Sequence, residues 1–131
     1  MALQLGTALR TSMADAMVTA AAGGTFKLFS GAVPANCAAA DPAGELADGT
    51  LPSPALTSAS GAATKAGTWT TTGTAAGTAA SFRLYTSGAV CFAQGDVTAT
   101  SGGGVMEISS TTIAIGQVDT VTSVTLTVGG A

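Results

Sequence analysis

The chain contains no histidine, so it lacks the commonest general base of enzyme active sites and a common metal ligand. Its two cysteines, Cys37 and Cys91, have no evident activating partner. They are also too few for a structural zinc site, which needs about four ligands at short spacings. We therefore expect neither a Ser–His or Cys–His active site nor a zinc centre, and we expect a non-enzymatic protein without a cofactor.

Charged residues are scarce as well. They make up 8% of the 131 residues, against roughly 25% in an average soluble protein. The net charge is −3, and the basic residues Arg10, Lys27, Lys65 and Arg83 are scattered. Nucleic-acid binding requires clustered basic residues, so we expect no nucleic-acid partner. Because so few charges protect a free monomer poorly, we expect part of the surface to be covered in a larger assembly.

Long apolar runs are also missing. No uninterrupted apolar stretch of about 18 residues occurs, so we expect no membrane helix. Arg10 and Asp15 interrupt the N-terminal segment, which therefore does not resemble a secretory signal, and we expect the protein to act or be assembled in the cytoplasm. A reducing cytoplasm favours free thiols at Cys37 and Cys91, although their spacing leaves open whether the two side chains meet.

Apolar residues recur every four positions near the N-terminus, and this spacing predicts an amphipathic helix over about residues 7–22. Gly23 and Gly24 follow and can end the helix. The stripe fits packing on the protein's own sheet, which is the commoner role, or docking on a partner. Its members are Leu5, Leu9, Met13 and Met17.

The rest of the chain shows the two-residue alternation of short strands. Seven or so strands behind one helix fit an antiparallel β-sandwich, with jelly-roll or immunoglobulin-like connections, or a small barrel, and we expect the sandwich. The predicted organisation is an N-terminal arm and helix over residues 1–24 and a β-sandwich domain over residues 25–131. The predicted strands lie in residues 25–30, 50–56, 65–72, 79–86, 89–97, 105–108, 112–115 and 121–128.

Acidic residues gather after the first predicted strand, at Asp41, Glu45 and Asp48. Such a group could bind calcium or supply a carboxylate pair for glycoside hydrolysis. The central glycine and terminal glutamate of an EF-hand loop are missing, so we expect a solvated loop without a metal.

Trp69 is the single tryptophan of the chain, and threonines flank it on both sides. It could stack on a carbohydrate or anchor the core. Burial is favoured, because tryptophan carries the largest apolar side chain and this chain has few others.

Three segments, together with the leading helix, resemble small virion structural proteins of tailed bacteriophages, among them capsid decoration and cement proteins. The segments are KLFSGAVPANCAAADPAGELA, TAASFRLYTSGAVCFAQGDV and TIAIGQVDTVTSVTLTV, at residues 27–47, 78–97 and 112–128. The most specific pieces are residues 29–34, residues 40–44 and the hairpin over residues 82–95.

The resemblance implies a non-enzymatic protein that decorates and stabilises a capsid by binding major capsid subunits. Such a protein is assembled in the host cytoplasm, lies on the capsid exterior and is a homo-oligomer, with trimers suggested by analogy. The implied contacts lie on the N-terminal arm and helix and on the following loop. The residues are Leu3, Leu5, Leu9, Met13, Pro34, Asp41 and Pro42.

Two alternatives remain open at this point. The chain could be a phage tail, neck or fibre component instead of a head protein. It could also be a carbohydrate-binding adhesion module that uses Trp69 and Tyr85 as ligand platforms.

Overall fold

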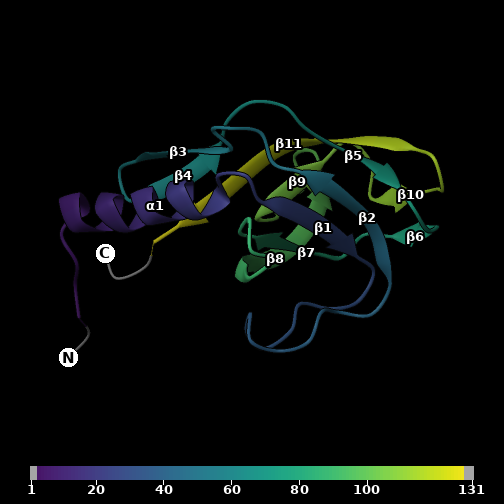
Figure 1. Ribbon diagram of the computed structural model, residues 1–131, viewed down its shortest axis with the longest axis horizontal. Helices are drawn as coiled ribbons and strands as arrows, with labels where there is room; N and C mark the ends of the chain where they lie inside the picture. Colours follow the sequence, from purple (N-terminus) through teal and green to yellow (C-terminus); the bar gives the residue numbers. More distant parts are fainter. Residues whose placement is uncertain (1–2, 129–131) are drawn as a thin grey trace.

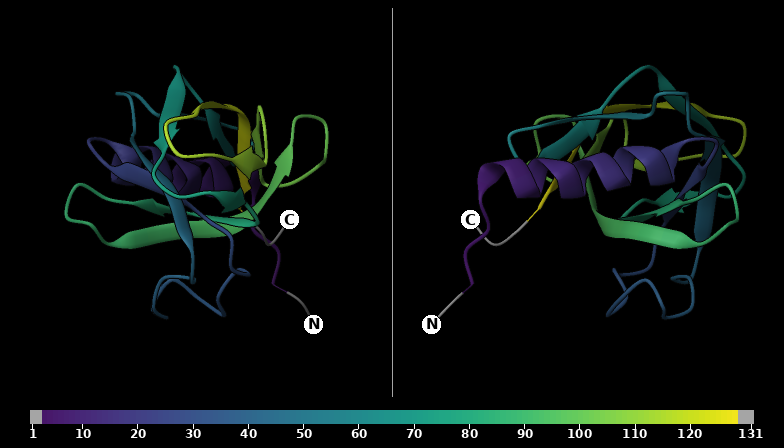
Figure 2. Two further views of the ribbon diagram at one scale, coloured as in Figure 1. Left: turned by 90° about the vertical axis from the view of Figure 1, so that its right-hand side faces the viewer. Right: turned by 60° about the vertical axis from the view of Figure 1, so that its left-hand side comes forward.

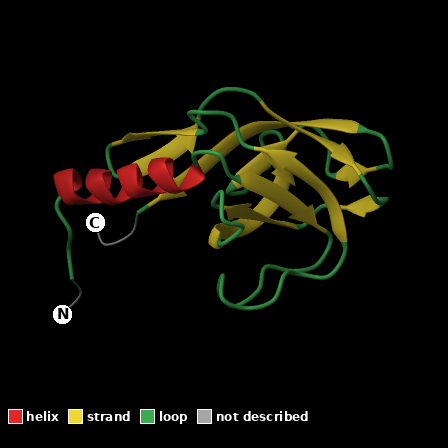
Figure 3. Ribbon diagram, viewed as in Figure 1, coloured by secondary structure: helices red, strands yellow, loops and turns green. Residues whose placement is uncertain are grey.

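The structure is a computed structural model that describes residues 3–128 (Figures 1 and 3). These residues form one helix followed by eleven strands. The expected mainly-β fold with one leading helix is therefore confirmed. The elements are α1 (Thr7–Ala21), β1 (Thr25–Phe29), β2 (Glu45–Thr50), β3 (Leu56–Ala59), β4 (Ala62–Lys65), β5 (Trp69–Gly73), β6 (Gly77–Thr78), β7 (Ser81–Tyr85), β8 (Cys91–Ala99), β9 (Met106–Ile108), β10 (Thr112–Ile113) and β11 (Val118–Thr127).

Seven of the strands form a closed barrel in the order β11-β5-β2-β1-β7-β8-β9, and β9 returns to pair with β11. Neighbours in the ring are antiparallel except β8 and β9, which are parallel. The expected sandwich is not confirmed, because β11 pairs with β5 along one edge and with β9 along the other, which joins the two ends of the sheet. The β3–β4 hairpin continues from the second half of β11, and β6 pairs with β10 separately.

Large apolar side chains fill the barrel interior. The alternation of β1 and β7 directs Phe26, Leu28, Phe82 and Leu84 into it, and all four are fully buried. Phe26 packs on Trp69 with ring centroids 5.5 Å apart. The other large buried side chains of this core are Met106, Ile108, Ile113 and Val121.

The helix α1 matches the predicted helix to within one residue, and it packs on the β3–β4 hairpin (Figure 1). Ala14 and Ala21 of α1 are fully buried against the domain. Their small side chains allow the helix to pack closely at these two positions. Ser58 of β3 donates a hydrogen bond to Asp15, and the Gly61 N–H donates to Thr11 Oγ1 at 3.0 Å. The helix therefore packs on the protein's own sheet, but not through the whole predicted stripe, because Leu9 and Met13 of that stripe are exposed.

Two local predictions were wrong. Residues 45–50 were expected in an acidic loop, but they form β2, because pairing with β1 and β5 outweighs the poor strand propensity of the acidic residues. One strand was predicted over residues 50–56, but Thr50 ends β2, Leu56 begins β3, and Pro52 and Pro54 lie in the connection between them.

Candidate functional site

The first candidate surface is the loop between β1 and β2, residues 30–44, which we call the 30–44 loop. Buried Arg83 of β7 holds it on the outside of the barrel. The Arg83 guanidinium donates to the carbonyl oxygens of Asn36 at 3.1 Å and Ala39 at 3.0 Å. It also donates to the carboxylate of Asp41 at 2.9 Å and to Gln94 Oε1 at 3.1 Å. One side chain thus fixes three points of the loop.

Asp41 accepts a second hydrogen bond, from the hydroxyl of Tyr85 at 2.7 Å. Burial raises the pKa of Tyr85 above its ordinary value, and the bond to Asp41 raises it further. Lys27 lies 5.6 Å from the centre of the Tyr85 ring and forms an ion pair with Glu45 at 2.8 Å. The hydrogen bond to Glu45 raises the pKa of Lys27. Two of the three clustered acidic residues are therefore each paired with a cation.

A disulfide between Cys37 and Cys91 also ties the loop to β8, with the two Cα atoms 5.4 Å apart. The expectation of free thiols was wrong. Gln94 donates to the carbonyl oxygen of Pro34 at 2.7 Å, and together with Arg83 it places the loop over the start of β8. The two cysteines meet for this reason although they are 54 residues apart in sequence.

The predicted contact residues Pro34, Asp41 and Pro42 all lie in this loop, where Pro34 and Pro42 are half-buried. The carbonyl of Pro34 and the carboxylate of Asp41 are engaged by barrel residues. The Asp41 side chain nevertheless keeps 43% of its surface exposed. These residues therefore have a role within the fold, and any contact with a partner would be additional.

The second candidate surface lies on the N-terminal arm and α1. Leu3 is 78% exposed, Leu9 52% and Met13 44%, whereas Leu5 is half-buried. The charged side chains of α1 turn toward the domain: Arg10 packs beside Gly61, and Asp15 binds Ser58. The opposite side carries no charge, and we call it the α1 outer face. It consists of Ala8, Leu9, Ser12, Met13, Ala16 and Thr19.

The two surfaces lie apart. In Figures 1 and 2 the arm and the start of α1 are at one end of the molecule, while the 30–44 loop hangs from the barrel some way along it. The structure thus brings the predicted contact residues together in two groups and does not merge them into one site.

The proposed carbohydrate platform is not available. Trp69 is fully buried, and its indole N–H donates to the carbonyl oxygens of Ala55 and Ala66, both at 3.1 Å. Tyr85 is only 6% exposed. The prediction that Trp69 anchors the core is confirmed, and neither ring can stack on a sugar in this conformation.

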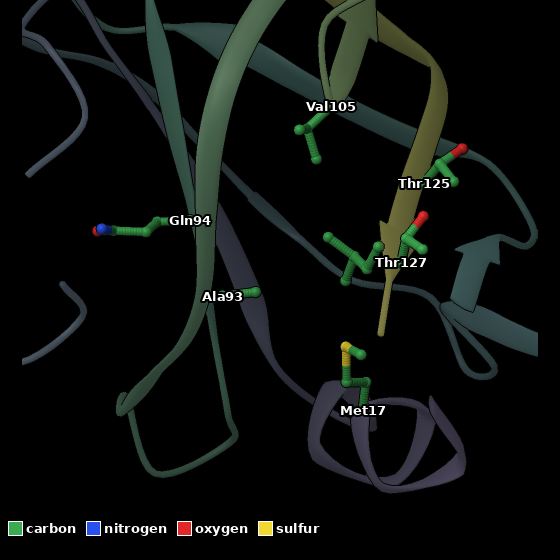
Figure 4. A pocket seen from close by; sticks show the side chains of 7 residues that line it. Met17, Ala93, Gln94, Val105, Thr125 and Thr127 are labelled. Carbon is green, nitrogen blue, oxygen red and sulfur yellow. The ribbon is translucent and has the colours of Figure 1, made fainter. Parts of the chain in front are cut away.

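An open cavity of about 400 Å³ lies between β8 and β11 (Figure 4). Sequence reasoning missed it, because its walls come from four segments that are distant in sequence. Only Met17 had been singled out, as a member of the helix stripe. The cavity is lined by Met17, Ala93, Gln94, Val105, Thr125, Leu126 and Thr127.

Within residues 3–128, the helix is neither long nor apolar enough to cross a membrane. Comparison with protein-family models, curated proteins and solved structures gives no match to this chain. The resemblance to phage virion proteins therefore stays a prediction, and it enters below as a proposal.

Proposed function

We propose that this protein is a non-enzymatic virion protein that decorates a tailed-bacteriophage capsid and stabilises it by binding major capsid subunits through the α1 outer face. The supporting observation is the exposure of Leu9 and Met13 on a helix face that carries no charge. Exposed apolar surface without charge is typical of contact regions on proteins. The resemblance of the 27–47 and 78–97 segments to virion proteins supplies the identity of the partner.

The strength of one such contact is modest. Leu9 and Met13 are each about half exposed, so covering both would contribute on the order of 2 kcal/mol. A single copy would then bind weakly, and stability would come from many copies on a regular lattice, helped by self-association of the decoration protein. We therefore also propose that it is a homo-oligomer, for which a trimer is the simplest arrangement by analogy.

Co-sedimentation with empty expanded capsids, assembled from the major capsid protein of the same genome, tests this proposal. We expect the wild-type chain to sediment with the capsids and the Leu9→Gln/Met13→Gln variant to bind about tenfold more weakly. The matched control is Ile115→Gln/Val118→Gln, which alters two residues that are 74% and 66% exposed at the other end of the molecule. The proposal fails if the wild-type chain does not sediment with the capsids.

The copy number of the protein in the virion distinguishes a location in the head from a location in the tail. A large number of copies supports decoration of the head, whereas a handful would place the protein in the tail and contradict the proposal. Equal loss of binding in the helix variant and its matched control would also count against the α1 outer face as the contact.

A further inference from the structure

The cavity between β8 and β11 is a gap in the barrel wall, one strand wide. β9 pairs with β8 on one side and with β11 on the other, so it holds them two strand spacings apart, about 9.5 Å. β9 begins at Met106. Beyond the start of β9, residues 91–96 of β8 and residues 125–127 of β11 continue, and within residues 3–128 no strand lies between them. We call this space the wall gap (Figure 4).

Backbone groups of β11 face the wall gap. The Thr125 N–H points to this side, because it donates to the Val105 carbonyl at 3.1 Å. The Val128 N–H points to the other side and donates to the Gly61 carbonyl at 2.9 Å. Backbone groups alternate between the two edges of a strand, so the N–H and C=O of Thr127 point into the gap.

Backbone groups of β8 face it from the opposite wall. The Val97 N–H donates to the Ala80 carbonyl on the β7 side, and the Thr100 N–H donates to the Ile108 carbonyl on the β9 side. The same alternation therefore directs the N–H and C=O of Gln94 into the gap. Two facing strand edges whose backbone groups point into the space between them form a template for one added strand.

The side chains around the gap define what that strand should be. Leu126, Met17, Ala93 and Val105 present apolar groups toward the barrel and α1, and each is buried or packs against the core. Thr125 and Thr127 are exposed on the outer side of β11. An extended, uncharged segment with alternating apolar and polar residues matches this lining.

We propose that the wall gap receives the N-terminal arm, residues 3–6, of a second copy of this chain. In the arm Leu3 and Leu5 alternate with Gln4 and Gly6, no residue is charged, and Leu3 is 78% exposed. The arm has four residues, and β11 extends three residues, 125–127, beyond Val124, its last partner of β9.

The place of the arm favours a second copy. The arm precedes α1, which begins at Thr7, and its Leu3 side chain is 78% exposed, so the arm does not lie in the gap of its own copy. In Figure 1 the arm runs away from the barrel. Insertion into a neighbour links copies head to tail, which gives a closed ring when the rotation allows it.

NMR titration tests the proposal without capsids. The acceptor is the ¹⁵N-labelled full-length Leu3→Ser/Leu5→Ser variant, whose own arm no longer fits. We expect unlabelled wild-type chain to shift the amide signals of Gln94 and Thr127 and to slow their hydrogen exchange. Unlabelled Leu3→Ser/Leu5→Ser chain should bind about tenfold more weakly or not at all, whereas unlabelled Ile115→Ser/Val118→Ser chain should bind as the wild type does.

Three results would overturn it. One is the absence of shifts at Gln94 and Thr127 with wild-type chain. The second is equal binding by all three donors. The third is slow exchange of Thr127 in labelled wild-type chain that does not depend on dilution, which would show that the arm occupies the gap of its own copy. None of these results bears on capsid co-sedimentation, so this inference and the proposed function can fail separately.

Discussion

The carboxylate of Asp41 lies 2.9 Å from the guanidinium of Arg83, and this pair joins the 30–44 loop to the barrel. The two partners differ in environment, since the side chain of Arg83 is 2% exposed and that of Asp41 is 43% exposed. Arg83 is thus a buried cation whose charge is balanced by one carboxylate and by the carbonyl groups of the loop. Removing either Arg83 or Asp41 should lower the free energy of unfolding. Without Asp41 the buried charge of Arg83 would lose its carboxylate, and without Arg83 the buried carbonyl groups would lose their donor.

Arg83→Met should lower the free energy of unfolding by about 3 kcal/mol, because the carbonyl groups of Asn36 and Ala39 lose their donor. Denaturant unfolding of the oxidised protein measures this change. Lys27→Met is the matched control: it removes an ion pair whose partners are 30% and 42% exposed, and should cost less than about 1 kcal/mol. Equal losses in the two variants would contradict the central role of Arg83.

Replacing the disulfide, as in Cys37→Ala/Cys91→Ala, should lower stability by about 4 kcal/mol in the chain-entropy model, because the bridge spans 54 residues. The 30–44 loop should nevertheless stay in place, since the hydrogen bonds of Arg83 and Gln94 do not depend on the bridge. Hydrogen exchange of the loop amides in the folded variant checks this. Exchange at the rate of an unstructured peptide while the barrel stays protected would show that the bridge alone holds the loop.

Stability should fall in alkaline solution because of Tyr85. Its pKa is higher in the folded than in the unfolded state, so the folded state binds more protons above the unfolded pKa of about 10. The stabilising contribution of the Tyr85 hydroxyl is complete below that pH, and it is lost as the pH rises toward the pKa of the folded state. Lys27 also has a raised pKa and acts in the same direction, so Tyr85→Phe is needed to isolate the phenol. This variant should show a shallower decline of stability above about pH 10 in denaturant unfolding at several pH values. An unchanged decline would assign the effect to other groups.

Local patterns in the sequence predicted the local structure well. The four-residue repeat predicted α1, the hairpin expected over residues 82–95 is the β7–β8 hairpin, and the burial of Trp69 followed from its size. Closure of the barrel could not be predicted from the sequence, because the pairing of β9 with β11 depends on the path of the whole sheet and not on either strand's own residues.

In the candidate site, too, the contacts between residues distant in sequence could not be predicted. The resemblance implied that Asp41 is an outward contact, but its partners Arg83 and Tyr85 are 42 and 44 residues away. Alternation placed Arg83 opposite Phe82 on β7, and an arginine there is normally taken to be solvent-exposed. Only the return of the 30–44 loop over β7 buries it. Helical spacing placed Leu9 and Met13 in one stripe and favoured that stripe as the packed side, whereas both side chains are exposed.

Gly49 of β2 should not tolerate a side chain. A Cβ atom there would lie 2.6 Å from the Phe26 ring and 2.8 Å from the Thr70 carbonyl oxygen. The ring cannot yield freely, because it packs against Trp69 inside the barrel. Gly49→Ala should therefore cost about 1–3 kcal/mol of unfolding free energy through overpacking. Gly88→Ala, at an exposed turn where the nearest atom would be 3.7 Å away, is the matched control and should change stability little. If thermal unfolding shows the same midpoint for both variants, Phe26 has room to move and the barrel is less tightly packed at this position than the contact distances imply.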